Sequence, residues 1–441
     1  MISFDYSIII HIIRIVNRGV IMDINKLLDG VKCSCGKFHS CDIEHVYICS
    51  GAISKLTELC TSYQNILIVA DQNTYAAAGE KTEAALEGKV CNKVIFSGDK
   101  LLVPDEAAIA EVNQKLAGAD LIVGIGSGVI QDLCKYVSHF ASMPYMIVAT
   151  APSMDGYASD GAAMILNGMK ETVKAGLPRA IIADTDVIRN APMEMIKAGF
   201  GDIIGKYSAL NDWKLSQAVT GEYFCTYIYD MTLDMVHQTQ GLAKGLLQRD
   251  EESIKVLMEA LVIVGILMSF AGSSRPASGS EHHLSHFFEI VGIVSGEEYL
   301  PHGIDVAFST VITANVRQKI LNSSMPAAIY RESNESYKAK MHDIYKEVAQ
   351  GCIELQDRVG NYAADRLSVY TQKHEQICDV LKEMPSGEEI KAILELAELD
   401  MSEFYKLYSD EKIQNAILYS KDLKDRYTVL WLYYDLYGGA Q

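Results

Sequence analysis

Short apolar runs alternate with helix-forming stretches in the first part of the chain. Runs bounded by glycine, proline or aspartate predict buried strands at residues 47–52, 65–71, 93–98, 119–128 and 145–152. Helix-forming stretches such as 74–88 and 105–118 lie between them. Strands that alternate with helices predict a parallel sheet with crossover helices.

The pattern changes after about residue 190. Long amphipathic stretches follow one another with almost no strand-like alternation, at residues 191–218, 228–247, 250–271, 280–293, 303–321 and 336–358. We therefore expect an N-terminal arm at 1–43, an α/β nucleotide-type (Rossmann-like) domain at 44–190 and an all-α domain at 191–441. An active site is expected in the cleft between the two domains.

The first 21 residues are rich in isoleucine but are interrupted by charged residues and His11. No apolar run reaches the ~20 residues that a membrane span needs. The positive charges follow the apolar part, whereas a secretory signal carries them before it. A second methionine, Met22, precedes an ordinary polar helix start. We expect residues 1–21 to be an over-extended translation start or a small accessory arm, without an assigned function.

The composition of the 441 residues is that of an ordinary globular protein, with 49% hydrophobic and 22% charged residues. The 39 Lys and Arg stand against 57 Asp and Glu, a net charge of −18. An acidic surface repels phosphate backbones and anionic lipid, so neither nucleic acid nor a membrane is an expected partner. The ten cysteines are scattered, which favours a reducing cytoplasm.

A glycine-rich turn follows the apolar run that begins at Leu121. It contains Gly124, Gly126, Ser127 and Gly128, and the next helix carries Asp132. Such a turn lets backbone N–H groups and the helix dipole approach a phosphate, although any tight strand-to-helix turn also favours glycine. The spacing is not G-x-G-x-x-G. Asp71, at the end of another strand, suits either ribose hydroxyls or a helix cap.

Histidines are concentrated in one short region. Four of the 11 lie within 21 residues: His282, His283, His286 and His302. On a helix, His282 and His286 are one turn apart and share a face. The cluster favours a metal site, and Asp202, expected at the start of a helix, is the best candidate for an oxygen ligand. Asp202 with two histidines would leave positions open for substrate oxygens.

A second group of potential ligands lies near the N-terminus. Cys33, Cys35, His39 and Cys41 could in principle bind zinc, but their spacing matches no standard zinc finger. Nine residues can hardly wrap a tetrahedral ion alone. A hairpin or loop with buried thiols is the favoured interpretation.

Five motifs together resemble bacterial sn-glycerol-1-phosphate dehydrogenase. They are GIGSGVIQDLCKYVS (124–138), TAPSMDGYASDGAAM (150–164), ADTDVIRNAPMEMIKAGFGDIIGKYSALNDW (183–213), GSEHHLSHFFE (279–289) and LPHGIDVAF (300–308). That family belongs to the superfamily of iron-containing alcohol dehydrogenase, glycerol dehydrogenase and dehydroquinate synthase. The resemblance runs from about residue 44 to at least 310 and implies a dehydroquinate synthase-like fold.

The resemblance also implies roles for individual residues. Asp202, His282 and His302 would be the ligands of one zinc or nickel ion, and His286 a substrate contact or proton relay. The expected cofactor pyrophosphate loop contains Gly126, Ser127, Gly128, Val129 and Asp132. Thr150 and Ser153 would line the nicotinamide, Asp155 and Ser159 would lie near the substrate and the transferred hydride, and Asp71 would hold the adenine ribose. One departure is Val129-Ile130-Gln131, where the family pattern has Thr-Ile-Asn.

The implied activity is metal-dependent reduction of dihydroxyacetone phosphate to sn-glycerol 1-phosphate, and the reverse, with NAD preferred and NADP tolerated. Lys206 and Arg275 are candidates for the substrate phosphate, and either could equally be an ordinary ion-pair residue. A glycerol or other polyol dehydrogenase is the alternative. A dehydroquinate synthase-like lyase and an inactive metal- or nucleotide-binding regulator are more remote. A homo-oligomer, dimer or larger, and a place in phospholipid biosynthesis are further expectations.

Overall fold

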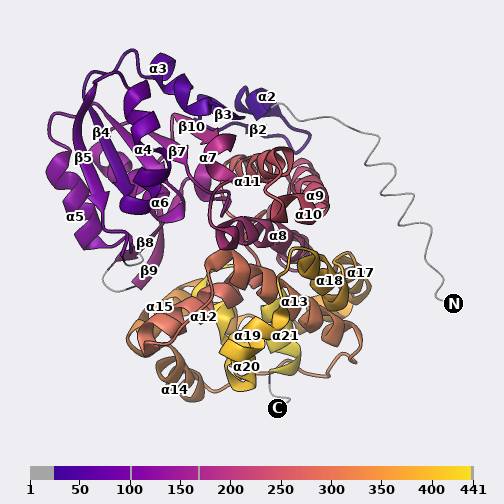
Figure 1. The fold of residues 1–441 in the computed structure, drawn as a ribbon. Coiled ribbons are helices and arrows are strands. Elements are labelled where there is room, and N and C mark those ends of the chain that lie inside the picture. Colours follow the sequence, from indigo (N-terminus) through magenta and orange to yellow (C-terminus); the bar gives the residue numbers. More distant parts are fainter. Residues whose placement is uncertain (1–23, 100–101, 167–168, 439–441) are drawn as a thin grey trace.

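The computed structural model describes residues 24–99, 102–166 and 169–438 (Figure 1). The expectation for residues 1–21 therefore lies outside the described residues. The N-terminal half is built around a sheet and the C-terminal half is made of helices, which confirms the predicted fold class.

Six parallel strands form the sheet, in the order β3-β10-β7-β6-β4-β5. They are β3 (His45–Cys49), β4 (Ile66–Asp71), β5 (Val90–Phe96), β6 (Leu121–Gly126), β7 (Tyr145–Ala149) and β10 (Ala180–Asp184). The four central strands are buried almost throughout, as near-continuous apolar runs predict for strands covered on both faces. The helices of this half are α3 (Leu56–Leu59), α4 (Gln72–Ala85), α5 (Glu106–Lys115), α6 (Gly128–Ala141) and α7 (Thr185–Ile188).

Two features of this half were not predicted from the sequence. One is β10, which joins β3 to β7 and completes the sheet. The other is an antiparallel hairpin of β8 (Gly161–Leu166) and β9 (Met169–Lys174), which stands apart from the main sheet. The hairpin's first strand is a continuous apolar run, but its residues alternate between half-buried and buried positions, whereas the central strands are buried almost throughout.

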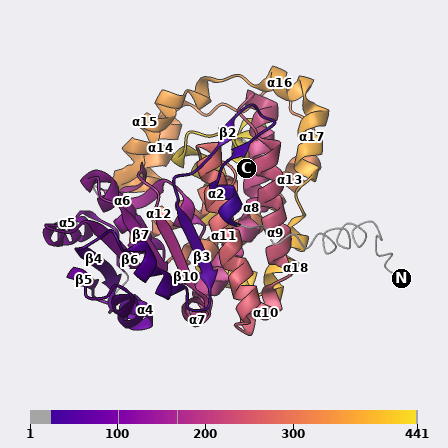
Figure 2. The ribbon, with the colours of Figure 1, turned by 90° about the horizontal axis from the view of Figure 1, so that it is seen from above.

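Beyond residue 190, the described residues form helices and no strand. The long ones are α8 (Met193–Thr220), α9 (Thr226–Gln240), α11 (Glu251–Ala271), α12 (Ser280–Ser295) and α13 (His302–Leu321). Shorter ones are α10 (Ala243–Leu247), α14 (Asn334–Tyr345), α15 (Ala349–Val359), α16 (Leu367–Gln372), α17 (His374–Lys382), α18 (Gly387–Leu396), α19 (Met401–Leu407), α20 (Asp410–Tyr419) and α21 (Val429–Tyr437). Figure 2 shows α8, α9 and α13 side by side next to the α/β half.

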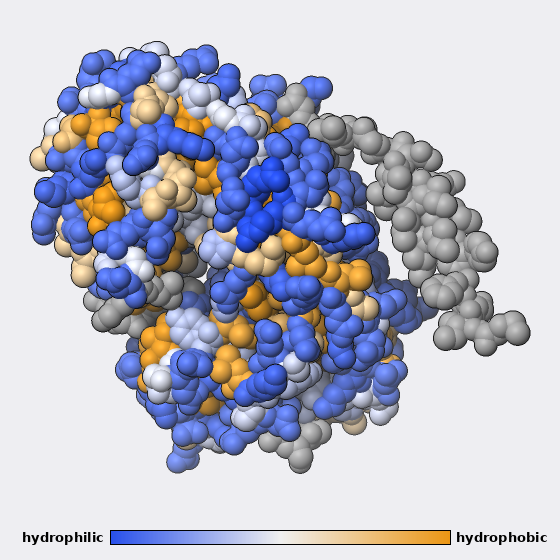
Figure 3. Space-filling model, viewed as in Figure 1, coloured by the Kyte–Doolittle hydropathy of each residue, from blue (hydrophilic) through white to orange (hydrophobic). Residues whose placement is uncertain are grey.

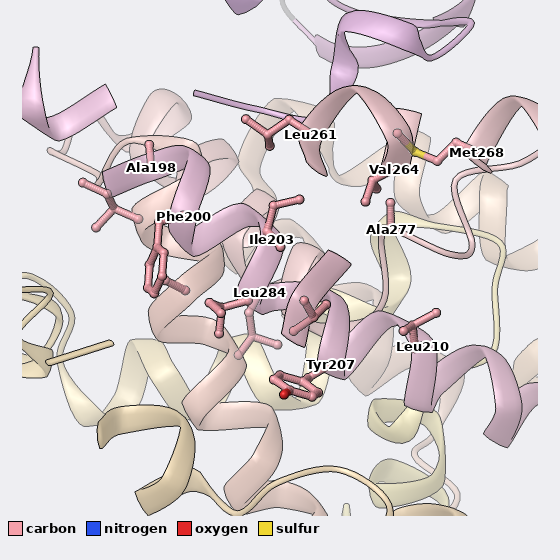
Figure 4. Packing of buried hydrophobic residues seen from close by; sticks show 14 of the residues in the cluster. Ala198, Phe200, Ile203, Tyr207, Leu210, Leu261, Val264, Met268, Ala277 and Leu284 are labelled. Atoms are coloured by element: carbon pink, nitrogen blue, oxygen red, sulfur yellow. The ribbon is translucent and has the colours of Figure 1, made fainter. Parts of the chain in front are cut away.

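Helix α8 is the central packing element of the molecule. In Figure 4, Ile203 of this helix lies between Leu261 of α11 and Leu284 of α12. Two glycines allow backbones to touch there. A methyl group at Gly199 would overlap the carbonyl oxygen of Pro152, and one at Gly303 would overlap the carbonyl oxygen of Ala198. These contacts place the segment after β7 and the start of α13 directly on α8.

One helix in the described part of the chain, α11, is long and apolar enough to cross a membrane, with a mean hydropathy of 2.2. Of that apolar stretch, 72% is buried inside the protein, where it packs against α8 and α9. The surface seen in Figure 3 is mainly hydrophilic, with hydrophobic residues scattered over it.

The chain before the sheet forms α2 (Ile24–Leu28) and a short hairpin of β1 (Val31–Lys32) and β2 (Phe38–His39). The hairpin expected around the N-terminal cysteines is thus present, but its thiols are not buried as expected, since Cys35 is exposed and Cys33 and Cys41 are half-buried. The hairpin packs beside the start of α9 and the end of α11, far along the chain from its own strands. All ten cysteines have free thiols.

Candidate active site

The strand order reverses direction between β4 and β6. β5 follows β4 on one side, whereas β6 and then β7 lie on the other. In open parallel sheets, ligands bind outside the carboxyl ends of the strands at such a reversal. Asp71 ends β4 and Gly126 ends the adjacent β6, so these two predicted cofactor residues lie together at this position.

Asp71 forms a helix cap. Its Oδ1 accepts hydrogen bonds from the backbone N–H groups of Asn73 and Thr74, at 2.8 and 2.9 Å, and Thr74 completes a capping box. A helix cap was one of the two roles that the sequence left open for Asp71. The cap also fixes the Asp71 carboxylate at the edge where a ribose would lie, so the two roles are compatible.

The glycine-rich turn leads directly into α6. Ser127 is the N-cap residue without a side-chain cap bond, and the helix begins at Gly128 and Val129. The first N–H groups of the helix therefore have no intrahelical acceptor and carry the positive end of its dipole. A methyl group at Gly126 would lie 2.6 Å from Ile130, so this glycine is required by the packing of the turn. The turn has the features of a pyrophosphate site.

The segment 150–161 joins this turn to the helical half. The backbone N–H of Thr150 donates to the Gly126 carbonyl at 3.1 Å. Fully buried Lys135 donates to the carbonyls of Gly156 (3.0 Å) and Gly161 (2.8 Å), and its ammonium lies 3.5 Å from the Ser159 hydroxyl. Ser153 and Asp155 are half-buried within the segment. On α6, the Asp132 carboxylate pairs with Lys135 at 3.5 Å.

Asp202, His282 and His302 come together in space. One ligand atom of each lies within 4.8 Å of the others, and Asp202 Oδ1 is 3.6 Å from His282 Nε2. The sequence suggested that Asp202 begins a helix, and this prediction is wrong. Asp202 lies in the interior of α8, where its backbone is fully bonded and its buried side chain points to α12 and α13. One carboxylate and two imidazoles fit a divalent zinc, nickel or iron ion.

Glu281 orients the first histidine. Its Oε1 lies 2.7 Å from His282 Nδ1, so the opposite nitrogen, Nε2, faces Asp202. Carboxylate partners of this kind fix the tautomer of metal-binding histidines. Burial, followed by the charge of Lys206, lowers the pKa of His282 well below its usual value. The ring is therefore neutral, the form in which imidazole binds a metal.

His286 lies next to these ligands on α12. Its ring is 6.1 Å from that of His282 and 5.4 Å from that of His302, measured between centroids. Glu289 Oε2 lies 3.7 Å from His286 Nδ1. The third neighbouring histidine, His283, is fully buried and apart from this group, and burial lowers its pKa well below the usual value.

Lys206 lies between two carboxylates. Its buried Nζ is 2.6 Å from Asp202 Oδ1 and 2.6 Å from Asp155 Oδ2. Burial alone would lower the pKa of Lys206, but the two carboxylates outweigh it and raise the pKa. The Asp155 backbone N–H also donates to Asp202 Oδ2 at 3.0 Å. Segment 150–161 therefore contacts the metal-ligand group as well as the glycine-rich turn.

Arg275 has other partners. Its guanidinium pairs with Glu222, donates to the Tyr427 carbonyl at 2.9 Å and donates to the Ser216 hydroxyl at 3.1 Å. The structure thus gives it the ion-pair role that the sequence left open, and its donors are directed at protein acceptors rather than at a phosphate.

Three site residues were not singled out from the sequence: Lys135, Glu281 and Lys424. Lys424 lies in the loop before α21, with its Nζ 3.1 Å from the Ser278 hydroxyl, just before α12. After burial and Lys206, its charge is among the causes that lower the pKa of His282. Glu281 directly precedes the candidate ligand His282, so the sequence could have indicated it. Lys424 lies in no motif that would have indicated a role.

The chain is similar to known dehydrogenases. Residues 47–192 match the iron-containing alcohol dehydrogenase family. Glycerol-1-phosphate dehydrogenase (NAD(P)+) of Geobacillus thermodenitrificans is 30% identical over 385 residues, which cover 84% of this chain and 88% of the relative. The enzyme of the same name from Halalkalibacterium halodurans is 35% identical over 292 residues, 64% of this chain and 72% of the relative.

Solved structures share the fold. Alcohol dehydrogenase from Oenococcus oeni superposes with a TM-score of 0.58 at 15% identity, covering 87% of this chain and 92% of the other. An iron-containing alcohol dehydrogenase from Thermococcus thioreducens superposes with a TM-score of 0.53 at 15% identity, covering 82% and 99%. From its sequence similarity over most of both chains, the protein belongs to the glycerol-1-phosphate dehydrogenase (NAD(P)+) family, within the iron-containing alcohol dehydrogenase superfamily.

Proposed function

We propose that the chain catalyses the metal-dependent, NAD(P)-linked reduction of dihydroxyacetone phosphate to sn-glycerol 1-phosphate, and the reverse reaction. One observation carries the proposal: segment 150–161 contacts both the glycine-rich turn at the sheet reversal and the Asp202 group on α8. A nucleotide and a carbonyl substrate bound at these two places would meet at this segment. Family membership supplies the substrate class.

Asp202, His282 and His302 would hold the divalent ion. Bound there, the ion would supply a Lewis acid for a carbonyl or alcohol oxygen. Glu281 keeps His282 in the required tautomer, and the Asp155 backbone N–H holds the second Asp202 oxygen. Zinc and nickel are our proposed ions, and this ligand set accepts either.

The proposed cofactor residues lie at the carboxyl ends of the sheet strands and in the segment that follows β7. NAD(P) would supply the hydride donor or acceptor. The N–H groups at Gly128 and Val129 would bind its pyrophosphate, Asp71 its adenine ribose, and Thr150 and Ser153 would line its nicotinamide. Lys135, held by Asp132, fixes the carbonyls of Gly156 and Gly161, so Ser159 stays beside the reacting carbon.

His286 is our candidate for the proton transfer. It is half-buried, lies beside His302, and has Glu289 next to its Nδ1, so it can exchange protons with solvent at one nitrogen. Lys206 pairs with both Asp155 and Asp202, and its third N–H would hold a developing negative oxygen.

The substrate phosphate needs a cation in an acidic protein. Lys206 is already shared by two carboxylates and Arg275 is paired with Glu222. Lys424 stands nearer to the protein surface beside the start of α12, so we propose it as a third candidate alongside these two. The domain boundary near residue 190, a cytoplasmic location and a homo-oligomer remain predictions.

The function is tested with purified protein, NADH or NADPH, and two substrates, dihydroxyacetone phosphate and dihydroxyacetone. We expect turnover of the phosphorylated substrate, its loss with a metal chelator, and its recovery on adding zinc or nickel. Asp202→Ala, His282→Ala and His302→Ala should abolish activity and the metal bound at this site, with the far-ultraviolet circular dichroism unchanged, whereas exposed His139→Ala should change neither. Equal turnover of dihydroxyacetone would instead identify a glycerol dehydrogenase.

A further inference from the structure

Four potential metal ligands meet outside the active site. The β1–β2 hairpin contributes Cys33, Cys35 and His39, and the residue that caps α9 contributes Cys225. Their four ligand atoms all lie within 4.8 Å of one another. The Sγ atoms of Cys33 and Cys225 are 3.5 Å apart, and His39 Nε2 is 3.4 Å from Cys35 Sγ and 3.6 Å from Cys225 Sγ.

These separations match the edges of a zinc coordination tetrahedron. With Zn–S near 2.3 Å and Zn–N near 2.05 Å, the tetrahedral angle places two sulfurs roughly 3.8 Å apart and a sulfur and a nitrogen roughly 3.6 Å apart. Three observed separations lie within a few tenths of an ångström of these values. The four side chains therefore already surround a position for one ion.

The histidine of the group is held in the form that binds metal. His39 is 1% exposed, and its Nδ1 lies 3.0 Å from the carbonyl oxygen of Phe270 at the end of α11. A carbonyl can only accept, so Nδ1 carries the proton and the lone pair of Nε2 is available at the position that the three sulfurs surround. The Phe270 ring, stacked on His39 with centroids 5.5 Å apart, fixes the orientation of the imidazole.

Two polar groups lie close to sulfur atoms of this cluster. The backbone N–H of Cys35 points at Cys33 Sγ at 3.5 Å, in a turn completed by Gly36 with φ of +87°. The hydroxyl of Tyr223 lies 3.5 Å from Cys35 Sγ. Thiolates, rather than thiols, bind metal ions.

We propose that Cys33, Cys35, His39 and Cys225 bind one zinc ion with all four positions filled by protein. Such a closed Cys₃His site is structural, because no position is left for substrate. It would tie the N-terminal hairpin to the start of α9 and, through His39, to the end of α11. The sequence had grouped Cys41 with this set; the structure replaces it with Cys225, which lies 184 residues further along the chain (225 − 41).

The test separates this site from the active site by the kind of ligand. The full chain, produced without a polyhistidine tag and purified under reducing conditions, is analysed for zinc and then exchanged with Co²⁺. Thiolate ligation gives a sulfur-to-cobalt charge-transfer band, which Asp202, His282 and His302 have no sulfur to produce. This band should survive His282→Ala and disappear in Cys225→Ser, with a loss of one equivalent of zinc.

Cys41→Ser is the matched control, since it removes a thiol from the same segment but outside the group; its spectrum and zinc content should equal those of the parent. A chelator should lower the thermal midpoint of the parent and of Cys41→Ser. If Cys225→Ser is insoluble, Cys35→Ser, at an exposed position, replaces it. Absence of the sulfur-to-cobalt band in the parent, its persistence in the soluble variant, or a disulfide between Cys33 and Cys225 in the reduced protein would overturn the proposal.

Discussion

Glu281 Oε1 and His282 Nδ1 lie 2.7 Å apart, although neighbouring residues of a helix normally point in different directions. The contact forms in the first turn of α12, where the Glu281 side chain turns back to the backbone N–H of Gly279, 2.8 Å away. The same carboxylate thus closes the helix start and fixes the histidine.

Replacing Glu281 with glutamine keeps the size of the side chain but removes its charge. Because a second carboxylate raises the basicity of a ligating histidine, Glu281→Gln should weaken metal binding by about 10- to 100-fold. Competition of the protein with a chromogenic chelator measures this affinity. Exposed Glu298→Gln, just after the same helix, is the control. Equal affinities of the two variants would show that Glu281 serves only the helix start.

Gly199 allows the Pro152 carbonyl to touch α8. Gly199→Ala should lower the free energy of unfolding by about 1–3 kcal/mol, because neither backbone can yield easily. It should also reduce kcat, since the displaced segment carries Asp155. Gly176→Ala, at a position with nothing within 4 Å of the added methyl, should change neither quantity. Thermal unfolding and steady-state kinetics of both variants decide the matter.

Cofactor preference is predicted to depend on Asp71. A carboxylate at this edge disfavours the 2′-phosphate of NADP by like charge. Asp71→Ser retains a capping side chain and removes about 1 kcal/mol of repulsion, so the ratio of kcat/KM for NADP to that for NAD should rise roughly fivefold. Asp105→Ser changes the cap of α5 in the same way and should leave the ratio constant. An unaltered ratio in Asp71→Ser means that Asp71 acts as a cap alone.

Recognition of the phosphate should add substantially to catalysis. Loss of one or two charge-assisted hydrogen bonds of ~1.5–3 kcal/mol each predicts roughly 10- to 10⁴-fold lower kcat/KM for dihydroxyacetone. Lys206→Ala, Arg275→Ala and Lys424→Ala are compared on both substrates. The variant that lacks the phosphate-binding residue should lose activity on the phosphorylated substrate only. A uniform loss on both substrates assigns a variant to structure or chemistry instead.

The buried carboxyl of Asp305 predicts a pH dependence of stability. Burial raises the pKa of Asp305 well above its ordinary value of 3.8, even though Tyr408 donates to it at 3.0 Å. The folded state therefore holds the proton more tightly than the unfolded chain, and the free energy of unfolding falls as pH rises from 3.8 to the folded pKa.

Asp305→Asn cannot ionise and should escape this loss. The stability of Asp305→Asn relative to the parent should increase with pH above 3.8 and stay constant below it. Urea unfolding at a series of pH values measures the difference, with exposed Asp379→Asn as control. A difference that stays constant with pH would contradict the prediction.

Much of the fold could be predicted because its strands are continuous apolar runs. β4, β6 and β7 are buried on both faces, so pattern and structure agree within a few residues. The β8–β9 hairpin was missed although β8 is an apolar run, because β9 is largely polar and the two strands form a sheet of their own.

The site was partly predictable for a different reason. His282 and His302 occur close together in the sequence, so their grouping was visible there. The depth of Asp202 inside α8 was not, because the helix continues on both sides of it. The partnership of Cys225 with the N-terminal hairpin depends on tertiary packing alone, as does the choice of Glu222 as partner for Arg275.

The order of the strands has a consequence for synthesis on the ribosome. β3 is made before all other strands of the sheet, yet its strand partner is β10, which ends 135 residues later (184 − 49). Until residue 184 has emerged, β3 has no ladder to join, and pairs of such long sequence separation form slowly. During this interval the nascent chain exposes an unpaired strand edge, a known starting point for aggregation. Closure of the sheet at β3 is therefore a late event, and it is the step at which we expect chaperone assistance to matter most.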